Sequence, residues 1–585
     1  MAFHAAVEWA LIPDENAEER GQRASVDDRT AVYAFASSDA SGGFALAALN
    51  RSDPGRVCLD SLEEALKATE GLSEFGDRLA GYLLMEGPRE DFLHFKHGEV
   101  NELVAANESV APWLRKWIEG RHYHRIAWQA RGGGYSKSVS GDGWALFRRN
   151  MVKATRVLEE SWEDKPDHPG VAAELIALGL NLKGGDAKGA MRKWLGEMTE
   201  VQVDYGEGYS NVLWGLRPRW YGSHSEMIDF GRDCLESGRF DSNVPWWYLQ
   251  AHRDVASEWD LPSAYFPEFR RHRELKKLFE GFENESARES WRRHDRTQAV
   301  ATYFMAGKFD ETKEWLDKLG GEPLDTSVLA SWGTDLEPEW IVGKTEAFTG
   351  PFGKELDGAQ NDEIRFRSDD ALETYEKVLS EADESMPGSA REFLEHRREI
   401  VRIESEFDEG NAIEPFAPGG DGVGWKLFNV EGIDDGIVLS GEDGRLCLAY
   451  CESRVGPSFR MEGKIAIDDP DDDARIWIAF GYPQRNTERW GAVSFVWEGG
   501  NTAVLLTNAM NVPEEMNELG FGDSAEFKLQ VGADGITLEV DGEIVWDNVP
   551  IPRKFVKERY ARIGFCAILG SEKTRARFSN LSLER

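Results

Sequence analysis

The apolar residues of this chain change their spacing near residue 415. Before that point they recur every three or four residues, as on the buried face of an α-helix, and after it they alternate with polar residues, as in β-strands. One regular fold does not combine two such long periodicities, so we predict a helical part followed by an all-β part. The Pro- and Gly-rich stretch 411–424 lies between them and is predicted to be a linker.

The length of the chain predicts several domains, because a single hydrophobic core stops growing at roughly 250–300 residues. For 585 residues we predict an N-terminal helical region over 1–120, a helical-repeat domain over 121–410, the linker, and a β-sandwich over 425–585. Within the repeat domain, the stretch 336–362 has the composition of a loop.

Two helical stretches are predicted from local spacing. The stretch 109–132 is predicted to be helical with an interruption near Gly120. The next helix is predicted to end before Pro166 and to carry one apolar face, made of Trp144, Phe147, Met151, Ala154, Val157 and Leu158.

The negative charge restricts the expected partners. The formal net charge is -38 at pH 7, which repels phosphate, so nucleic acid is not an expected partner. No segment has the roughly 18 apolar residues of a membrane helix, so membrane insertion is not expected. The start of the chain lacks a secretory signal, and the five cysteines lack disulfide or zinc spacing. We therefore expect a cytoplasmic protein, or a periplasmic or secreted one if a signal peptide has been removed.

A helical hairpin over 297–321 carries a repeat pattern. It has the Tyr, Gly, aromatic and large apolar residues of a tetratricopeptide hairpin at Tyr303, Gly307, Phe309 and Leu316. Thr312 stands where such a repeat usually has Ala, and no strict period runs through the chain. The segment resembles a degenerate tetratricopeptide-like array, and the concave groove of such arrays implies protein or peptide partners.

Two further motifs lie in the helical part. ARGGGYSKSVSGDGWALF (130–147) is a Gly-rich loop followed by Gly-Trp and a helix, and LRPRWYGS (216–223) is a turn ahead of a helix. They resemble a helical, tetratricopeptide-like domain of unknown function from uncharacterised bacterial proteins, over about residues 120–260. The resemblance implies no activity. It singles out four motif residues, Arg217, Arg219, Trp220 and His224.

The histidines of the helical part have structural explanations. A catalytic His needs a positioned acid or nucleophile, and none is predicted beside His224. Arginine stacking on tryptophan within a helical core accounts for the motif residues around it. His122 and His124 lie two apart in a predicted helix, where their side chains diverge, so a shared metal is not expected.

The strands after residue 425 predict a sandwich. About ten short alternating strands suit a β-sandwich or jelly roll. Its most distinctive motifs are the opening strand WKLF (425–428), the Asp-Gly hairpin EVDGEI and the closing segments RIGF and FSNLSL. They resemble a concanavalin-like or laminin-G-like domain, close to a bacterial domain attached to sugar-processing proteins, over about residues 420–585. Such folds include lectins, hydrolases and adhesive modules, so the resemblance implies glycan or protein binding without naming a ligand.

Aromatic and polar residues of the sandwich form a candidate ligand site. Sugars present apolar ring faces and hydroxyls, so a shallow site needs an aromatic platform beside hydrogen-bonding side chains. The candidates are Trp477, Tyr482, Arg485, Asn486, Trp490 and Trp497. The alternative is that two of these tryptophans belong to the core.

The acidic run 468–473 is the weakest candidate site. Its carboxylates suit a hard cation such as calcium, through Asp468, Asp471 and Asp473. The run lacks the ligand spacing and glycine of an EF-hand, and a solvated turn explains it equally well. We therefore expect no metal or other cofactor, with calcium as the alternative.

No catalytic constellation follows from these residues. A retaining glycosidase needs two carboxyl groups about 5 Å apart, and the suitably spaced Glu539 and Asp541 run into a hairpin turn, where acids are ordinary. We predict a non-catalytic binding or scaffold protein, with helical repeats for protein or peptide partners and a sandwich for glycan or protein. Two alternatives stay open: a carbohydrate-active hydrolase with its site on the sandwich, and a structural subunit of an assembly.

Overall fold

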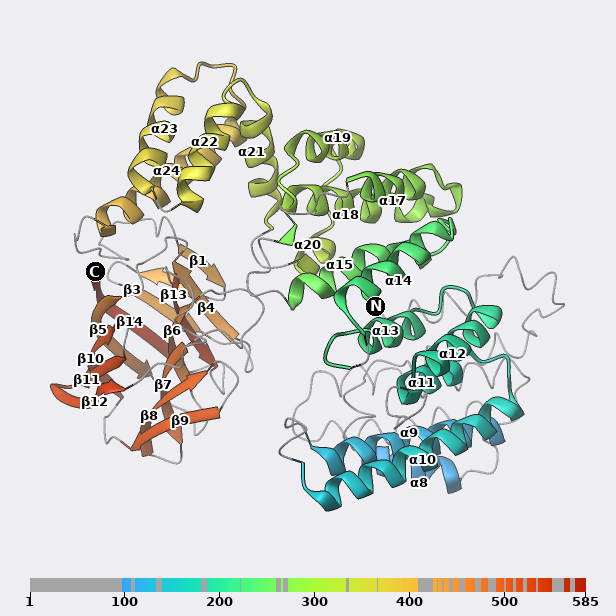
Figure 1. The fold of residues 1–585 in the computed structure, drawn as a ribbon. Coiled ribbons are helices and arrows are strands. Elements are labelled where there is room, and N and C mark those ends of the chain that lie inside the picture. The colour runs from blue at the N-terminus through green and yellow to red at the C-terminus, as the bar shows by residue number, and fades with distance from the viewer. Residues whose placement is uncertain are drawn as a thin grey trace, which may run out of the picture. The chain divides into compact units, whose positions relative to one another are not determined.

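The computed structural model divides the chain into two compact units, Met1–Glu258 and Trp259–Arg585, which are described separately (Figure 1). In the helical part it describes residues 97–106, 111–132, 139–179, 187–220, 222–258, 265–266, 272–332, 336–365 and 367–408. In the β part it describes residues 425–428, 430–433, 436–440, 446–451, 458–468, 475–481, 491–498, 501–508, 512–518, 523–532, 535–549, 562–568 and 574–584.

The described part of the first unit is helical. Its elements are α8 (His97–Ala106), α9 (Pro112–Arg131), α10 (Gly141–Asp164), α11 (Pro169–Gly179), α12 (Ala187–Val201), α13 (Gly206–Gly215), α14 (His224–Glu236), the 3-10 helix η2 (Val244–Trp246) and α15 (Trp247–Ser257). Neighbours along the chain pack together, notably α9 with α10, α11 with α12, and α14 with α15. The predicted helical character is confirmed for the described residues between 97 and 258. The predicted helical stretch before residue 97 and the predicted linker 411–424 lie outside the described residues.

Helix α10 forms where the apolar spacing predicts it. The hydroxyl of Ser140 caps its start by accepting a hydrogen bond from the backbone N–H of Gly143 at 3.0 Å. The helix ends before Pro166, which cannot continue it. Its buried face carries the residues of the predicted amphipathic stripe, namely Phe147, Met151, Ala154, Val157 and Leu158.

Helix α9 corrects one expectation. The sequence predicts an interruption at Gly120, but α9 is continuous from Pro112 to Arg131. A Cβ atom on Gly120 would lie 2.4 Å from Cγ of Leu158 on α10. The glycine therefore lets the two helices approach closely, and it does not end a helix.

The second unit begins with more helices. They are α17 (His272–Asn284), the 3-10 helix η3 (Ser286–Trp291), α18 (Arg292–Met305), α19 (Phe309–Leu319), α20 (Thr326–Trp332), α21 (Pro338–Thr349), α22 (Gly353–Ile364), α23 (Ser368–Glu381) and α24 (Gly388–Asp408). Helices α18 and α19 are joined through Gly307, whose φ of 65° suits the turn. This is the hairpin with the repeat pattern, and the tetratricopeptide-like assignment itself stays a prediction. Helix α21 packs on both α19 and α24.

The β part consists of two antiparallel seven-stranded sheets. One has the order β1 (Trp425–Phe428), β4 (Leu446–Cys451), β13 (Arg562–Ile568), β6 (Arg475–Gly481), β7 (Gly491–Glu498), β8 (Asn501–Asn508) and β9 (Val512–Glu518). The other has the order β12 (Glu543–Val549), β11 (Ile536–Val540), β10 (Ser524–Val531), β5 (Phe459–Asp468), β14 (Arg575–Glu584), β3 (Gly436–Ser440) and β2 (Val430–Ile433). The predicted order of a helical part followed by a β-sandwich is confirmed.

Local chemistry fixes the register of the β11–β12 hairpin. Asp541 and Gly542 form its turn with φ values of 49° and 83°. Positive φ at both central residues matches the right-handed twist of the flanking strands, which is why Asp-Gly is favoured in such turns. The hairpin lies where the sequence predicts it.

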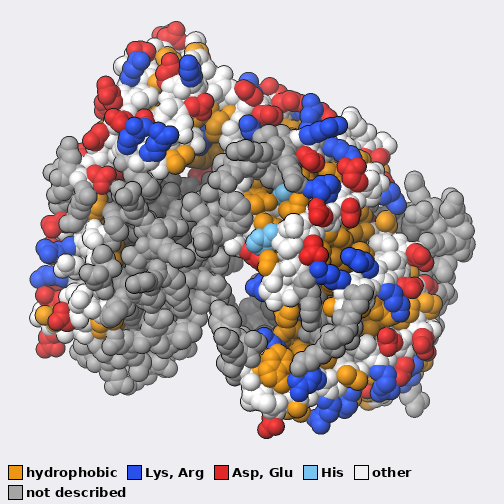
Figure 2. Space-filling model, viewed as in Figure 1, with side chains coloured by type: hydrophobic (Ala, Val, Ile, Leu, Met, Phe, Trp, Pro, Cys, Tyr) orange, Lys and Arg blue, Asp and Glu red, His pale blue; other side chains and the backbone are white. Residues whose placement is uncertain are grey.

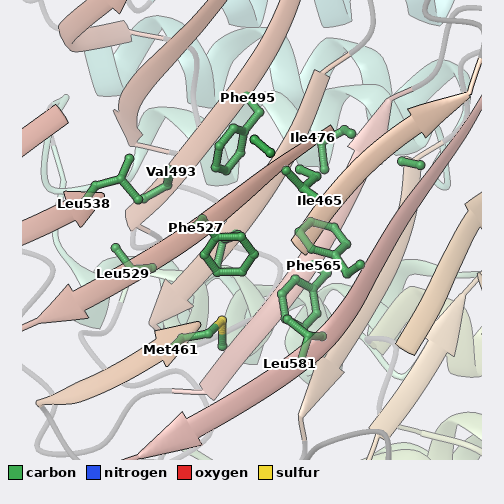
Figure 3. Close-up of a cluster of buried hydrophobic side chains, with 14 of the residues drawn as sticks. Met461, Ile465, Ile476, Val493, Phe495, Phe527, Leu529, Leu538, Phe565 and Leu581 are labelled. Atoms are coloured by element: carbon green, nitrogen blue, oxygen red, sulfur yellow. The ribbon is translucent and has the colours of Figure 1, made fainter. Parts of the chain in front are cut away.

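Aromatic and branched side chains fill the space between the sheets. Figure 3 shows Phe495, Phe527 and Phe565 pointing into this core from different strands. The rings of Phe565 and Phe578 lie 4.4 Å apart between centroids. Phe407, on the last turn of α24, belongs to the same buried cluster and is 1% exposed.

The surface of the helical part mixes charges of both signs. Figure 2 shows acidic side chains beside basic ones over the visible helical face, with apolar side chains between them. Some form pairs along one helix, as Arg156 does with Glu160 at 2.8 Å. Within the described part, no helix combines the length and the apolar character that crossing a bilayer requires.

Candidate functional site

The Arg-Trp turn after α13 joins three helices through one carboxylate. Glu258, at the end of α15, accepts hydrogen bonds from Nε2 of His224 at 2.8 Å and from Nη1 of Arg217 at 3.3 Å. Nη2 of Arg219 lies 3.9 Å from the same carboxylate. Three of the four predicted motif residues therefore meet at Glu258.

Trp214, which stands just ahead of the motif in the sequence, completes this corner. The Cζ atoms of Arg217 and Arg219 each lie 4.6 Å from the centroid of the Trp214 ring, which is cation–π geometry. Arg217 also pairs with Asp254 at 3.3 Å. The charges of two guanidinium groups and two carboxylates balance one another, although Nε of Arg217 is buried without a hydrogen-bond partner. The corner acts as a structural joint between the three helices.

Trp220, the fourth motif residue, packs toward α9. Its ring stands edge-on to that of Trp128 at 6.1 Å. The indole N–H of Trp128 donates to Nε2 of His124 at 2.9 Å, and Nδ1 of His124 lies 2.6 Å from Oε1 of Glu174. The indole donor assigns the proton of the imidazole to Nδ1, which donates to the carboxylate. With both nitrogens occupied, His124 has no free atom for general-base catalysis.

The carboxylate of Glu174 is charged although it is buried. Burial by itself raises its pKa, but the charge of Arg121, the hydrogen bond from His124 and the charge of Arg125 outweigh burial and hold the pKa of Glu174 well below its usual value. Nε of Arg121 lies 3.5 Å from Oε2 of Glu174. This ion pair fastens α11 to α9.

The predicted divergence of the two neighbouring histidines on α9 is present. His124 faces Glu174, whereas Nδ1 of His122 lies 2.8 Å from Nδ1 of His97 on α8. The two rings therefore do not share a site.

The acidic run of the sandwich is only partly described. Asp468 is the exposed last residue of β5, and Asp471 and Asp473 lie outside the described residues. Among the residues that the structure describes, no three His, Cys, Asp or Glu side chains are placed to hold a metal ion.

The aromatic candidates of the sandwich lie on and around β6 and β7. On β6, Ile476 and Ile478 are fully buried, so strand alternation turns the partly exposed Trp477 away from the core. On β7, position 497 lies on the same face of the strand as the core residues Val493 and Phe495, opposite to the face of position 477. The four remaining candidates, Tyr482, Arg485, Asn486 and Trp490, lie outside the described residues. The ligand site here stays a prediction.

A groove that the sequence does not predict lies among α19, α21, α24 and the α19–α20 connection. Its volume is about 890 Å³. Apolar side chains from three helices line it, namely Leu316, Trp340, Val342 and Phe393. The rings of Trp340 and Phe393 meet edge-on at 4.7 Å. We call these four residues the apolar floor.

Acidic side chains surround the apolar floor. Six carboxylates line the groove, Asp317, Glu322, Glu337, Glu339, Glu346 and Glu392, against one lysine, Lys313, and one histidine, His396. Glu322, Glu339 and Glu392 are exposed, and none of them forms an ion pair within the described ranges. Glu322 interacts with the charge of Arg296, which is itself paired with Glu283. We call these three residues the free acids of the groove.

The sequence hides this groove because its walls are far apart along the chain. Trp340 lies in the stretch 336–362, whose loop-like composition is misleading, since the structure forms α21 and α22 there. Pro338 and Gly353 are the first residues of these helices, and a proline there costs no hydrogen bond. Phe393 comes from α24, and only tertiary packing places it beside Trp340.

Comparisons with known proteins identify no family. No protein-family model matches the chain, and no curated protein matches its sequence. Similar solved structures include the carbohydrate recognition domain of Emp46p, at 13% identity, covering 27% of this chain and 87% of that one with a TM-score of 0.23. Carbohydrate-binding module CBM66 from Bacillus subtilis is 14% identical, with 28% of this chain and 96% of that one covered and a TM-score of 0.20. The Crh5 transglycosylase is 8% identical, with 30% of this chain and 82% of that one covered and a TM-score of 0.24. Similarity at these TM-scores supports no inference about what the chain binds.

Proposed function

We propose that this protein is a non-catalytic binding protein that holds a polypeptide segment of a partner in the groove of α19, α21 and α24. The observation that carries the proposal is an apolar floor accessible from solvent and built from three separate helices. A volume of about 890 Å³ lies within the roughly 300–1,000 Å³ of ordinary ligand sites.

The shape of the groove favours a polypeptide over a small molecule. Small-molecule sites enclose most of their ligand, whereas this groove is partly open to solvent. Its lining comes from the three helices α19, α21 and α24 and from the α19–α20 connection. Grooves between helices commonly receive the apolar side chains of a bound segment while its backbone stays partly in solvent.

The polar clusters of the first unit support a non-catalytic role. Both ring nitrogens of His124 are occupied, and Glu258 is shared by His224 and Arg217. Groups that are already satisfied contribute to packing and orientation, and they do not offer a free base or acid to a substrate.

Selection of random peptides against the full chain tests the proposal. We expect a displayed peptide library to yield binders that lose at least tenfold in affinity for Leu316→Asn or Val342→Asn, since both changes place an amide on the apolar floor. Ile364→Asn, at an apolar residue of α22 that is 61% exposed and outside the groove, should bind as the unchanged protein does. Far-UV circular dichroism identifies a variant that fails to fold. If no peptide is enriched, or if the binders ignore both floor substitutions, the proposal is wrong.

A second candidate function rests on Trp477. Its place on the outer face of β6, beside partners Ser494 and Cys566 on the neighbouring strands, is one where an indole is available to stack on a sugar ring. We expect Trp477→Ala to abolish any binding of the full chain to a glycan array, with thermal stability retained. An array without signal for the unchanged protein rejects this candidate.

A further inference from the structure

We infer that the segment held in the groove is cationic, an amphipathic stretch in which one or two large apolar side chains are flanked by Lys or Arg. The inference rests on the proposed function and adds the chemical class of the partner. It follows from the excess of carboxylates over cations around the apolar floor.

Acidic residues outnumber basic ones at the groove far more than in the whole chain. The chain has 106 Asp and Glu residues against 68 Lys and Arg, whereas six carboxylates of the groove face one lysine. Three of the six form no ion pair in the described part of the chain. The excess of negative charge around the apolar floor is thus a local feature, beyond the acidity of the whole chain.

Covering the apolar floor would remove water from the free acids. A carboxylate that loses water without gaining a positive partner is strongly unfavourable. A neutral or acidic segment would therefore lose much of what it gains by covering the floor, while Lys or Arg beside the apolar anchor would supply the missing partners. The same acids repel acidic segments and increase the association rate of basic ones.

The apolar floor and the free acids together indicate which side chains the bound segment should carry. The partly exposed ring of Trp340, which meets the rings of Phe393 and His396 edge-on, contributes apolar surface to the floor. Glu339 precedes Trp340 on α21, and Glu392 precedes Phe393 on α24. Each aromatic residue of the floor therefore has an acid next to it in the chain, which favours a ligand that alternates apolar and basic groups.

Synthetic peptides of defined charge test the inference with the full-length protein. The probes are a short amphipathic peptide with Leu and Trp anchors flanked by Lys, the same peptide with Glu in place of Lys, the same peptide with Gln in place of Lys, and spermine as a cation without apolar groups. At low salt we expect the Lys peptide to bind at least tenfold tighter than the Glu or Gln peptide. Spermine should compete weakly, because it cannot use the apolar floor.

Matched triple variants separate the groove from the overall charge. We expect Glu322→Gln with Glu339→Gln and Glu392→Gln to weaken the Lys peptide about tenfold at low salt, with a smaller effect at high salt. The control combines Glu373→Gln, Glu376→Gln and Glu381→Gln, three exposed acids of α23 outside the groove, and should change affinity less than twofold.

The outcomes distinguish the two proposals. If the Gln peptide binds as tightly as the Lys peptide and still depends on Leu316 and Val342, the groove binds polypeptides but the inferred charge class is wrong. If both triple variants weaken binding equally, or if spermine competes as well as the peptide, attraction is general and the inference is also wrong. If binding of every peptide survives Leu316→Asn and Val342→Asn, the proposed function fails together with it.

Discussion

Lys344 on α21 holds an amine in an apolar position. Its Nζ lies 5.8, 5.2 and 5.3 Å from the ring centroids of Phe304, Phe309 and Phe348. Burial lowers the pKa of Lys344 to about 8, and the charge of Arg397 acts in the same direction. The charged form of this residue therefore opposes folding at neutral pH.

The pH dependence of unfolding tests this effect. The folded pKa of Lys344 lies below the ordinary value of 10.5, so between about pH 8 and 10.5 the unfolded chain binds more protons and the free energy of unfolding rises with pH. We expect Lys344→Met to raise the free energy of unfolding at pH 7 by about 1–2 kcal/mol, less than the pKa shift alone implies because the rings attract the cation. Urea unfolding from pH 7 to 10 measures the free energy of unfolding of both chains. Lys354→Met, which removes an exposed lysine, is the control. Parallel pH curves for Lys344→Met and the unchanged chain would contradict the explanation.

Gly120 gives a second prediction for a single residue. Gly120→Ala should lower the free energy of unfolding by about 1–3 kcal/mol, because its Cβ would meet Leu158 at 2.4 Å and force α9 away from α10. Gly196→Ala in α12 is the matched control, since nothing lies within 4 Å of its Cβ. That control should stabilise the helix by roughly 0.5–1 kcal/mol. Chemical denaturation measures both, and equal effects would show that packing at Gly120 is not tight.

Among the helices, the contact between α9 and α11 depends on the charge of Glu174. We expect Glu174→Gln to cost about 2–4 kcal/mol of unfolding free energy at pH 7, because Arg121 and His124 lose a buried partner. The pKa of Glu174 is lowered on folding, so its stabilisation is complete above the ordinary pKa of 4.5 and is lost as the pH falls below it.

The acid dependence identifies that charge. The stability difference between Glu174→Gln and the unchanged chain should shrink as the pH falls below 4.5. Tryptophan fluorescence during urea unfolding follows it. Glu160→Gln removes the exposed partner of Arg156 and should cost under about 0.5 kcal/mol. A difference that stays constant with pH would mean that the carboxylate acts by shape alone.

Elements with a clear period were predictable from the sequence, and contacts between distant elements were not. The stripe of α10 and the alternation of β5, β10 and β14 follow from residue spacing alone. Gly120 was misread because a glycine that permits close packing looks like one that ends a helix. The groove is not predictable from the sequence because Trp340 and Phe393 come from helices that are far apart along the chain. The spacing of apolar residues shows which face of each helix is buried, but it does not show which two helices pack together.

For the whole molecule, a net charge of -38 favours expansion through self-repulsion. We expect the midpoint of the first thermal transition to rise by a few degrees between roughly 20 and 200 mM salt. The added salt shortens the Debye length to about 10 Å, and this screening weakens the repulsion between like charges. Sodium chloride and choline chloride should act alike at equal ionic strength, as calorimetry would show. A midpoint that falls with salt would mean that the ion pairs outweigh the repulsion.

Phe407 has a consequence for how this chain can be divided. Its ring lies in the sandwich core although its backbone belongs to α24. A separately expressed sandwich that starts at residue 425 would lack this ring, and loss of a buried Phe typically costs about 3–5 kcal/mol. A fragment starting at residue 388 keeps it and should melt at a higher temperature in calorimetry. The last turn of helix α24 thus fills part of the core of the β-sandwich. A sandwich transferred to another protein would therefore have to include that turn.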